Sequence, residues 1–130
     1  AGSEWNPTDY GHFLTRRARG LPFWFSLAVH GTRAYSEAVE RTLEVTRAGA
    51  VLVDAAPHLD LIMDPVLSVL AFRRIGWEQA DYDAWSVRLM EDGTAFVLPT
   101  QVDGEPALRI CIVNPLTTVD DIDMILDSLA

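Results

Sequence analysis

The sequence predicts an α+β fold in which helices pack on an antiparallel or mixed four-stranded sheet. Its 130 residues, 49% of them hydrophobic, suffice for one compact core and are too apolar for a disordered chain. Helical and strand-like segments follow one another in the order α-α-β-β-α-β-β-α. The last two strands are joined by Asp103-Gly104, a strong signal for a hairpin turn.

The N-terminal part is expected to begin with an irregular lead-in over residues 1–14, where Asn-Pro and Gly interrupt regular structure. Residues 1–3 are compatible with a cloning remnant. A first helix is predicted over residues 13–30, with a bend at Pro22 and an end at Gly31.

The second half of this first helix is apolar on nearly every side, because it contains Phe23, Trp24, Phe25 and Leu27. A helix of this kind is buried on several faces or docks on something outside the chain. A self-contained domain is not expected to expose these side chains unless it forms oligomers through them.

Three further helices are predicted from periodicity and capping signals. In residues 33–55, a stripe of Val39, Leu43, Ala50 and Val53 lies opposite a face of glutamates and arginine. Residues 78–91 place Tyr82, Trp85 and Leu89 on one face. The last helix starts near Thr118, which forms a capping-box pattern with Asp121.

Four strands complete the expected fold. The first pair is predicted at residues 58–63 and 66–73, and the second strand of this pair is nearly continuously apolar, as is typical of a central strand. The second pair is predicted at residues 95–100 and 107–113.

The charged residues exclude several function classes. There are 19 acidic and 10 basic residues, a net charge of -9, so a basic nucleic-acid-binding surface is not expected. All ten basic residues are arginine, a bias that a GC-rich coding sequence would also produce. Without lysine, this chain alone cannot form a lysine Schiff base or a P-loop phosphate site.

The single cysteine, Cys111, excludes an internal disulfide and is consistent with a cytoplasmic protein. Because Cys111 lies in an apolar run, it is predicted to be a buried core residue rather than a nucleophile. The longest apolar stretch, residues 21–29, is too short to cross a bilayer, so no membrane association is expected.

No pattern of metal-ligating or nucleophilic residues stands out. His12, His30 and His58 do not have metal-ligand spacing, and His30 and His58 are interpreted as capping or packing residues. The acidic group Asp120, Asp121 and Asp123 is explained by its place at a helix start, and no metal site is predicted. Neither a nucleophile elbow nor a glycine-rich phosphate loop is present.

A cluster of three arginines and one separate arginine are candidates for binding an anionic partner. Arg16, Arg17 and Arg19 are either solvated residues at a helix start or contacts to an acidic partner or phosphate. Arg109 lies inside a strand, where alternation places it on the same face as Cys111 and Val113. A buried guanidinium there would need a partner, which is either a structural carboxylate or the carboxylate of a substrate.

Three stretches together resemble the C-terminal part of the group II pyridoxal-phosphate (PLP)-dependent amino-acid decarboxylases, which include aromatic-L-amino-acid and glutamate decarboxylases. Residues 15–31 match the Arg-Arg…Leu-x-x-Trp…Gly helix of the family, and residues 64–73 match a strand of its small domain. Residues 102–118, followed by Asp120-Asp121-Ile122, are similar to its last hairpin and helix. In this order the stretches cover about residues 15–129.

The resemblance implies the small C-terminal domain of a type I PLP fold, formed by residues 32–130. Residues 15–31 would then be an apolar helix that docks on a large domain absent from this chain. In the family, the cofactor lysine and the other PLP-binding residues lie in that large domain, so this chain would be inactive alone. A homodimer is also implied.

For the parent enzyme, the resemblance implies release of CO2 from an L-amino acid to give an amine, with PLP taking up the electron pair. Arg109 matches an arginine that contacts the substrate carboxylate in glutamate-decarboxylase-like relatives. Substrate selectivity would depend mainly on residues outside this segment. The alternative is a stand-alone α+β regulatory or interaction module of the ferredoxin-like kind.

Overall fold

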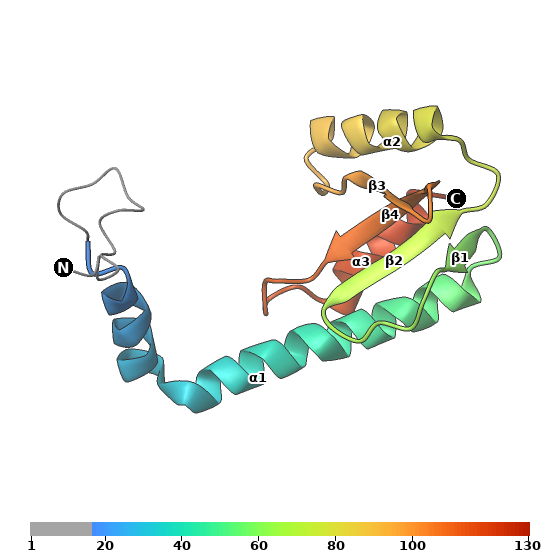
Figure 1. Cartoon of the computed structure of the whole chain (residues 1–130). Helices are drawn as coiled ribbons and strands as arrows, with labels where there is room; N and C mark the ends of the chain where they lie inside the picture. The colour runs from blue at the N-terminus through green and yellow to red at the C-terminus, as the bar shows by residue number, and fades with distance from the viewer. Residues whose placement is uncertain (1–16) are drawn as a thin grey trace, which may run out of the picture. The chain divides into compact units, whose positions relative to one another are not determined.

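The computed structural model describes residues 17–130, which fall into two units, Ala1–Tyr35 and Ser36–Ala130. The predicted α+β class with one four-stranded sheet is confirmed. The expected lead-in over residues 1–14 lies outside the described residues. The elements are α1 (Gly20–Ala55), β1 (Leu59–Leu61), β2 (Val69–Arg74), α2 (Gln79–Glu91), β3 (Pro99–Val102), β4 (Glu105–Cys111) and α3 (Val119–Asp127) (Figure 1).

The first unit contains the start of α1. Residues 17–19 are not helical and α1 begins at Gly20, whereas the predicted helix start at residue 13 lies outside the described residues. The predicted bend at Pro22 is also wrong: this residue lies in the first turn of α1, where its missing N–H removes no intrahelical bond. The interruption at Gly31 is confirmed, since its φ of 75° and ψ of 159° are not helical and suit glycine best.

The apolar side chains of the first unit are exposed. Phe23, Trp24 and Phe25 are between 55% and 62% accessible to solvent. Locally, the ring of Phe23 packs edge-on against Tyr35, whose hydroxyl forms a hydrogen bond with Ser26. None of the helices in residues 17–130 combines the length and the hydropathy that crossing a bilayer would require.

The sheet of the second unit is entirely antiparallel, with the spatial order β1-β2-β4-β3. The central contact joins β2 to β4, which lie side by side in Figure 1. The predicted hairpin between β3 and β4 is confirmed: Asp103 and Gly104 have φ angles of 55° and 82°, as a tight hairpin turn of the primed kind requires.

The strands present two different faces. One face, here called the covered face, packs against the second part of α1 and against α2 and α3 in a single hydrophobic core. The strand residues of this core are Leu59, Leu70, Phe72, Leu108 and Ile110. The opposite face, here called the open face, is defined by the alternating register positions Asp60, Val69, Ala71, Arg73, Thr100, Val102, Glu105, Ala107, Arg109 and Cys111.

The second part of α1 buries only part of the stripe that its apolar residues predict. Ala50 and Val53 are buried as expected, but Val39 is 57% exposed. Thr42 and Thr46 are buried instead, and each hydroxyl donates to a carbonyl of the preceding turn at 2.7 Å. Gly49 faces the core, where an added Cβ would lie 3.2 Å from side-chain atoms of Leu70 and Ile122. Gly49 is small, and Thr42 and Thr46 form their hydrogen bonds within the helix, so this part of α1 can approach the sheet closely.

The N-terminus of α3 forms the predicted capping box. The Oγ1 of Thr118 accepts from the Asp121 N–H at 3.3 Å, and the Asp121 carboxylate accepts from the Thr118 N–H at 2.8 Å. These two bonds satisfy backbone donors that the first helical turn leaves open. The helix is thereby anchored where it crosses the covered face.

All four predicted strands differ in extent from those observed, and the difference is clearest for β3 and β2. Residues 95–98 are not part of β3, because the Thr94 and Ala95 N–H groups bond to Leu89 and the Val97 carbonyl accepts from Ser86. This segment is tied to α2, and pairing with β4 begins only at Pro99. Similarly, β2 begins at Val69 rather than at residue 66.

Candidate functional site

Arg109 lies on the open face of the sheet, in the central strand β4. It pairs with Ala71 of β2, and its side chain is exposed to solvent. Within residues 17–130 its guanidinium forms neither a hydrogen bond nor an ion pair. The expectation of a buried arginine that needs a structural partner is therefore wrong. The guanidinium is available for an external anion.

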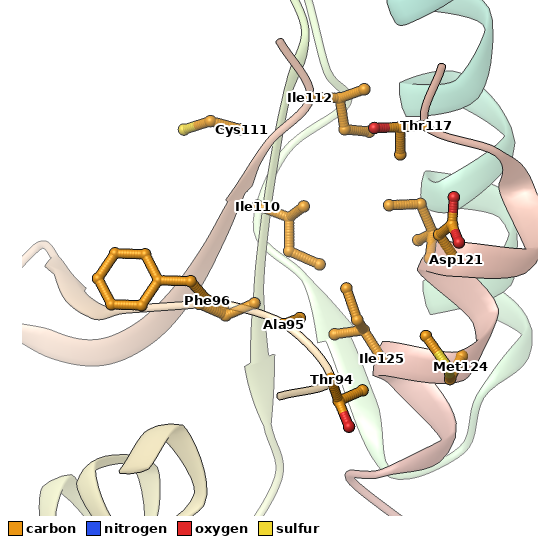
Figure 2. Close-up of a pocket in the computed structure, with 12 residues that line it drawn as sticks. Thr94, Ala95, Phe96, Ile110, Cys111, Ile112, Thr117, Asp121, Met124 and Ile125 are labelled. Atoms are coloured by element: carbon orange, nitrogen blue, oxygen red, sulfur yellow. The ribbon is translucent and has the colours of Figure 1, made fainter. Parts of the chain in front are cut away.

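The neighbours of Arg109 on the open face are mostly apolar, apart from Arg73 further along β2. Val69 and Ala71 come from β2, and Cys111 follows two positions along β4. Figure 2 shows the alternation directly, with Ile110 and Ile112 directed toward α3 and Cys111 directed away from it. A guanidinium surrounded by such residues has little competition from nearby carboxylates, which favours binding of a carboxylate from outside.

Cys111 is exposed, so the prediction of a buried core cysteine is wrong. The physical reason is the alternation of β4: the buried positions of its second half are Leu108, Ile110 and, after the strand, Ile112. The apolar run around the cysteine has outward positions as well as inward ones.

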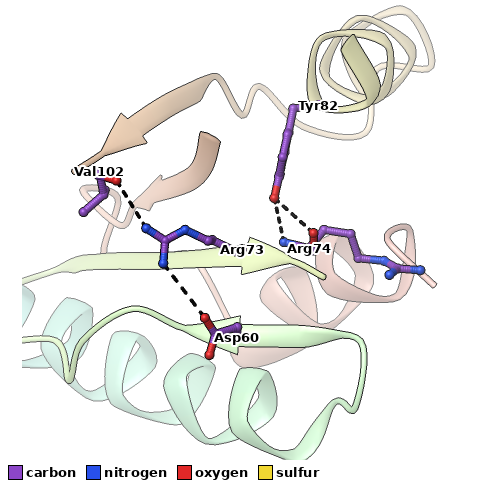
Figure 3. A network of polar contacts seen from close by, with 5 residues as sticks. All are labelled: Asp60, Arg73, Arg74, Tyr82 and Val102. Carbon is purple, nitrogen blue, oxygen red and sulfur yellow. Dashed lines mark hydrogen bonds and ion pairs between the residues drawn. The ribbon is translucent and has the colours of Figure 1, made fainter. Parts of the chain in front are cut away.

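A second arginine of the open face, Arg73, crosses β4 to reach the edge strand β3. Its Nη2 donates to the Val102 carbonyl at 3.2 Å, and its Nη1 lies 4.0 Å from an Asp60 oxygen of β1 (Figure 3). The side chain of Arg73 on β2 thereby connects the two edge strands, β1 and β3, across the open face. This role was not predicted from the sequence: the alternation of β2 indicates only that Arg73 is an outward residue, and the strand order brings Asp60 and Val102 within its reach.

The next residue, Arg74, points the other way and ties β2 to the chain end. Its Nε donates to the Leu129 carbonyl at 2.6 Å, and its backbone N–H donates to the Tyr82 hydroxyl at 2.9 Å. The guanidinium also lies over the ring of Trp77, 5.6 Å from its centre. These contacts make Arg74 structural and leave Arg109 as the arginine of the sheet without a partner in the described residues.

Among the residues that the structure describes, the histidines and the N-terminal arginines are not brought together in one site. His12 and Arg16 lie outside the described residues, whereas His30, Arg17 and Arg19 are exposed in the first unit. In the second unit, His58 is half-buried and its Nε2 has no partner among the described residues. Its carbonyl accepts from the Ile75 N–H at 2.9 Å, which places it in the turn region beside β1.

The acidic group at the start of α3 is used for capping. The backbone N–H and the hydroxyl of Thr118 hold the pKa of Asp121 below its ordinary value. No cluster of three or more potential metal ligands occurs within residues 17–130.

A cavity of about 250 Å³, with polar and apolar lining in about equal share, lies between β4 and α3. Ile110, Ile112 and Ile125 line it from these two elements, and Phe96 and Met124 also border it (Figure 2). Its lining offers one carboxylate, that of Asp121, which the capping box already engages. With its one carboxylate held by the capping box, the cavity offers no free charged side chain among the described residues.

Comparison with curated proteins finds amino-acid decarboxylases as relatives of this chain. The chain is 26% identical over 125 residues to an aromatic-L-amino-acid decarboxylase of Bacillus atrophaeus, which covers 91% of this chain and 26% of the relative. It is 30% identical over 120 residues to an L-2,4-diaminobutyrate decarboxylase of Rhizobium meliloti, covering 88% of this chain and 24% of the relative. The chain thus spans about a quarter of the length of these relatives. No family model matches the sequence.

Solved structures agree with this result. The glutamate decarboxylase domain of a Vibrio parahaemolyticus diaminobutyrate-pyruvate transaminase and L-2,4-diaminobutyrate decarboxylase superposes with a TM-score of 0.78 at 25% identity. The match covers 91% of this chain and 26% of that one. The Oryza sativa TDC with PLP and tryptamine has the same fold, with a TM-score of 0.78 at 19% identity over 95% of this chain and 28% of that one.

Fold and sequence together define the class: the chain resembles the PLP-dependent amino-acid decarboxylases of group II, as its motifs predict. More particularly, it corresponds to a portion of such an enzyme, about a quarter of the full length.

Proposed function

We propose that this chain is the C-terminal portion of a PLP-dependent decarboxylase that releases CO2 from an L-amino acid to give an amine. The observation that carries the proposal is the exposed Arg109, which has no partner within residues 17–130, on the open face of a fold shared with decarboxylases. The names of the relatives support aromatic amino acids, L-2,4-diaminobutyrate and histidine as substrate classes to be tested.

In this proposal Arg109 binds the carboxylate of the substrate. Its guanidinium presents parallel N–H donors that match the two carboxylate oxygens, and β4 fixes the backbone from which it projects. Loss of CO2 requires the scissile bond to be held in one orientation, which is a positioning task for a fixed cation. The apolar neighbours Val69 and Ala71 would exclude water from that ion pair once the face is covered.

The residues of this chain do not fit the cofactor itself. PLP enzymes attach the cofactor through a lysine, and the ten basic residues here are all arginine. When bound, PLP supplies an electron sink for the pair left behind by CO2. We therefore assign PLP binding to another part of the parent protein, and the residues described here to substrate positioning.

The exposed helix of the first unit supports a further contact with that part. Phe23, Trp24 and Phe25 offer an apolar surface that a large domain would cover. We further propose that the parent protein is a homodimer and is located in the cytoplasm. The decarboxylase function is favoured over a stand-alone ferredoxin-like module because the matched structure is a decarboxylase domain.

The test is CO2 release by the full-length parent protein. We expect PLP-dependent production of CO2 and of the matching amine from at least one of L-tryptophan, L-histidine and L-2,4-diaminobutyrate, each labelled at the carboxyl carbon. A preparation without added PLP serves as the control. Absence of CO2 release from all three amino acids by the PLP-loaded protein would contradict the proposed function.

A further inference from the structure

The two arms of the β3–β4 hairpin separate before the hairpin is complete. Pairing runs from the turn as far as Pro99↔Leu108 and then ends. Residues 95–98 leave the sheet toward α2, whereas β4 continues on the other arm. The cavity of about 250 Å³ lies between these arms, with residues 94–97 on one wall and residues 110–112 on another (Figure 2). It occupies the place where further pairing of the same hairpin would bring the arms together.

Backbone groups on both of these walls are left without partners. The Ile112 N–H donates to the Ser68 carbonyl at 2.9 Å, so the backbone groups of Ile112 face β2 and those of Cys111 face the opposite way. The N–H and C=O groups of Cys111 and of Phe96 form no hydrogen bond within residues 17–130. Pairing these two residues with each other would satisfy both sets of groups.

The register of the hairpin matches these groups to each other. Continuing the ladder beyond Pro99↔Leu108 by three residues places Phe96 opposite Cys111. A hairpin with a two-residue turn forms hydrogen-bonded pairs at every second position from the turn, and Phe96↔Cys111 is one of these positions. The segment Phe-Val-Leu over residues 96–98 also has residue types that favour a strand.

The side chains of this segment already alternate as they do in a strand. Val97 is 4% exposed, whereas Phe96 and Leu98 are 68% and 55% exposed. Figure 2 shows Phe96 directed away from α3, as Cys111 is. Pairing therefore requires the segment to move sideways toward β4, and its buried and exposed faces stay as they are.

The bonds that hold the segment to α2 do not oppose this movement. The Val97 carbonyl accepts from the Ser86 hydroxyl, and the Ala95 N–H donates to the Leu89 carbonyl at 3.5 Å. Ala95 and Val97 occupy the alternate positions of the register, whose backbone groups point away from β4. Both bonds can therefore persist when Phe96 and Cys111 pair.

We propose that residues 95–98 form a strap that closes onto β4 and completes the ladder as far as Phe96↔Cys111. The structure holds the strap in its unpaired form, and closure removes the cavity between the arms. Closure also places Leu98 opposite Arg109, so that an apolar side chain borders the candidate carboxylate-binding residue. This last consequence rests on the proposed function, whereas the pairing itself does not.

A disulfide test uses Cys111, the single cysteine of the chain. Phe96→Cys introduces a second thiol at the partner position, where a closed strap brings the two Cα atoms to about 5.5 Å, within the range of disulfides. Leu98→Cys is the matched control, because Leu98 is exposed on the same face but is two positions out of register with Cys111. Each variant of the full chain is oxidised with diamide at low protein concentration, and the intramolecular disulfide is measured by mass spectrometry.

We expect the disulfide to form at least roughly tenfold faster in Phe96→Cys than in Leu98→Cys. Without closure the order would not favour Phe96→Cys, because Leu98 adjoins the last pair of the ladder and stays closer to β4. A ratio below tenfold would overturn the proposal.

Hydrogen exchange of the unmodified chain gives a second test that no substitution can disturb. A closed strap protects the Cys111 amide, so we expect its exchange by NMR to be at least roughly tenfold slower than in the unfolded chain. The Ile112 amide, which is bonded to Ser68, serves as the internal reference. Exchange of Cys111 at the unprotected rate would refute closure, whatever the disulfide kinetics. Neither measurement involves CO2 release, so a failure of the strap leaves the proposed function to its own test.

Discussion

The two faces of the four-stranded sheet carry alternate residues of the same strands but differ in what they do. On the covered face Leu70, Phe72 and Leu108 are completely buried against the helices. On the open face Val69 and Arg109, their direct neighbours in sequence, are exposed. The covered face thus holds most of the strand residues of the hydrophobic core, whereas the open face carries the exposed candidate binding residue.

The largest expected difference between the two faces concerns the free energy of unfolding. We expect Phe72→Ala to lower the free energy of unfolding of the chain by about 3–5 kcal/mol, because the substitution leaves a cavity among fully buried side chains. The matched change on the open face, Val69→Ala, removes a partly exposed side chain and should cost less than about 1 kcal/mol. Urea unfolding followed by circular dichroism measures both values.

Similar losses from the two variants would contradict the comparison, since they would mean that the open face is packed within this chain as tightly as the covered one.

A smaller effect concerns pH and the attachment of α3 to the covered face. Because the capping box lowers the pKa of Asp121 in the folded chain, ionised Asp121 stabilises the fold above its unfolded pKa. That contribution is lost as the pH falls through the lowered folded value. We expect Asp121→Asn to weaken the dependence of stability on pH in this acidic range, measured as urea midpoints between about pH 2 and 5.

Asp123→Asn on the same helix is the matched control, because Asp123 is outside the capping box. If both variants showed the pH dependence of the unmodified chain, the capping carboxylate would have no measurable role in acid unfolding.

Much of the fold could be predicted because the deciding signals are local. Gly31 interrupts α1, Asp103-Gly104 forms the hairpin turn, and Thr118 with Asp121 caps α3, as their residue types require. The alternation of β4 likewise placed Arg109 and Cys111 on one face.

What could not be predicted depends on partners distant in the sequence. Alternation shows which residues share a face but not which face the helices cover, so Cys111 was assigned to the core. Thr46 is buried at 0% exposure although it is polar, because its hydroxyl is satisfied by its own helix. The role of Gly49 depends on the approach of Leu70 and Ile122, which no local pattern reveals.

The candidate site followed from the resemblance more than from the residue pattern. The strand pattern identified Arg109 as a residue that needed a partner, and the decarboxylase motifs gave that partner a chemical identity. The Arg73 bridge between Asp60 and Val102 was not predicted, because it depends on the spatial order of the strands.

The most direct measurement is the steady-state kinetics of Arg109→Met in the full-length parent, with Arg88→Met on exposed α2 as the control. Loss of a charge-assisted contact to the substrate carboxylate should lower kcat/KM by roughly 10- to 100-fold, with PLP absorbance and affinity unchanged. Arg88→Met should behave like the unmodified enzyme. An unchanged kcat/KM for Arg109→Met would contradict the assignment of substrate binding to the open face.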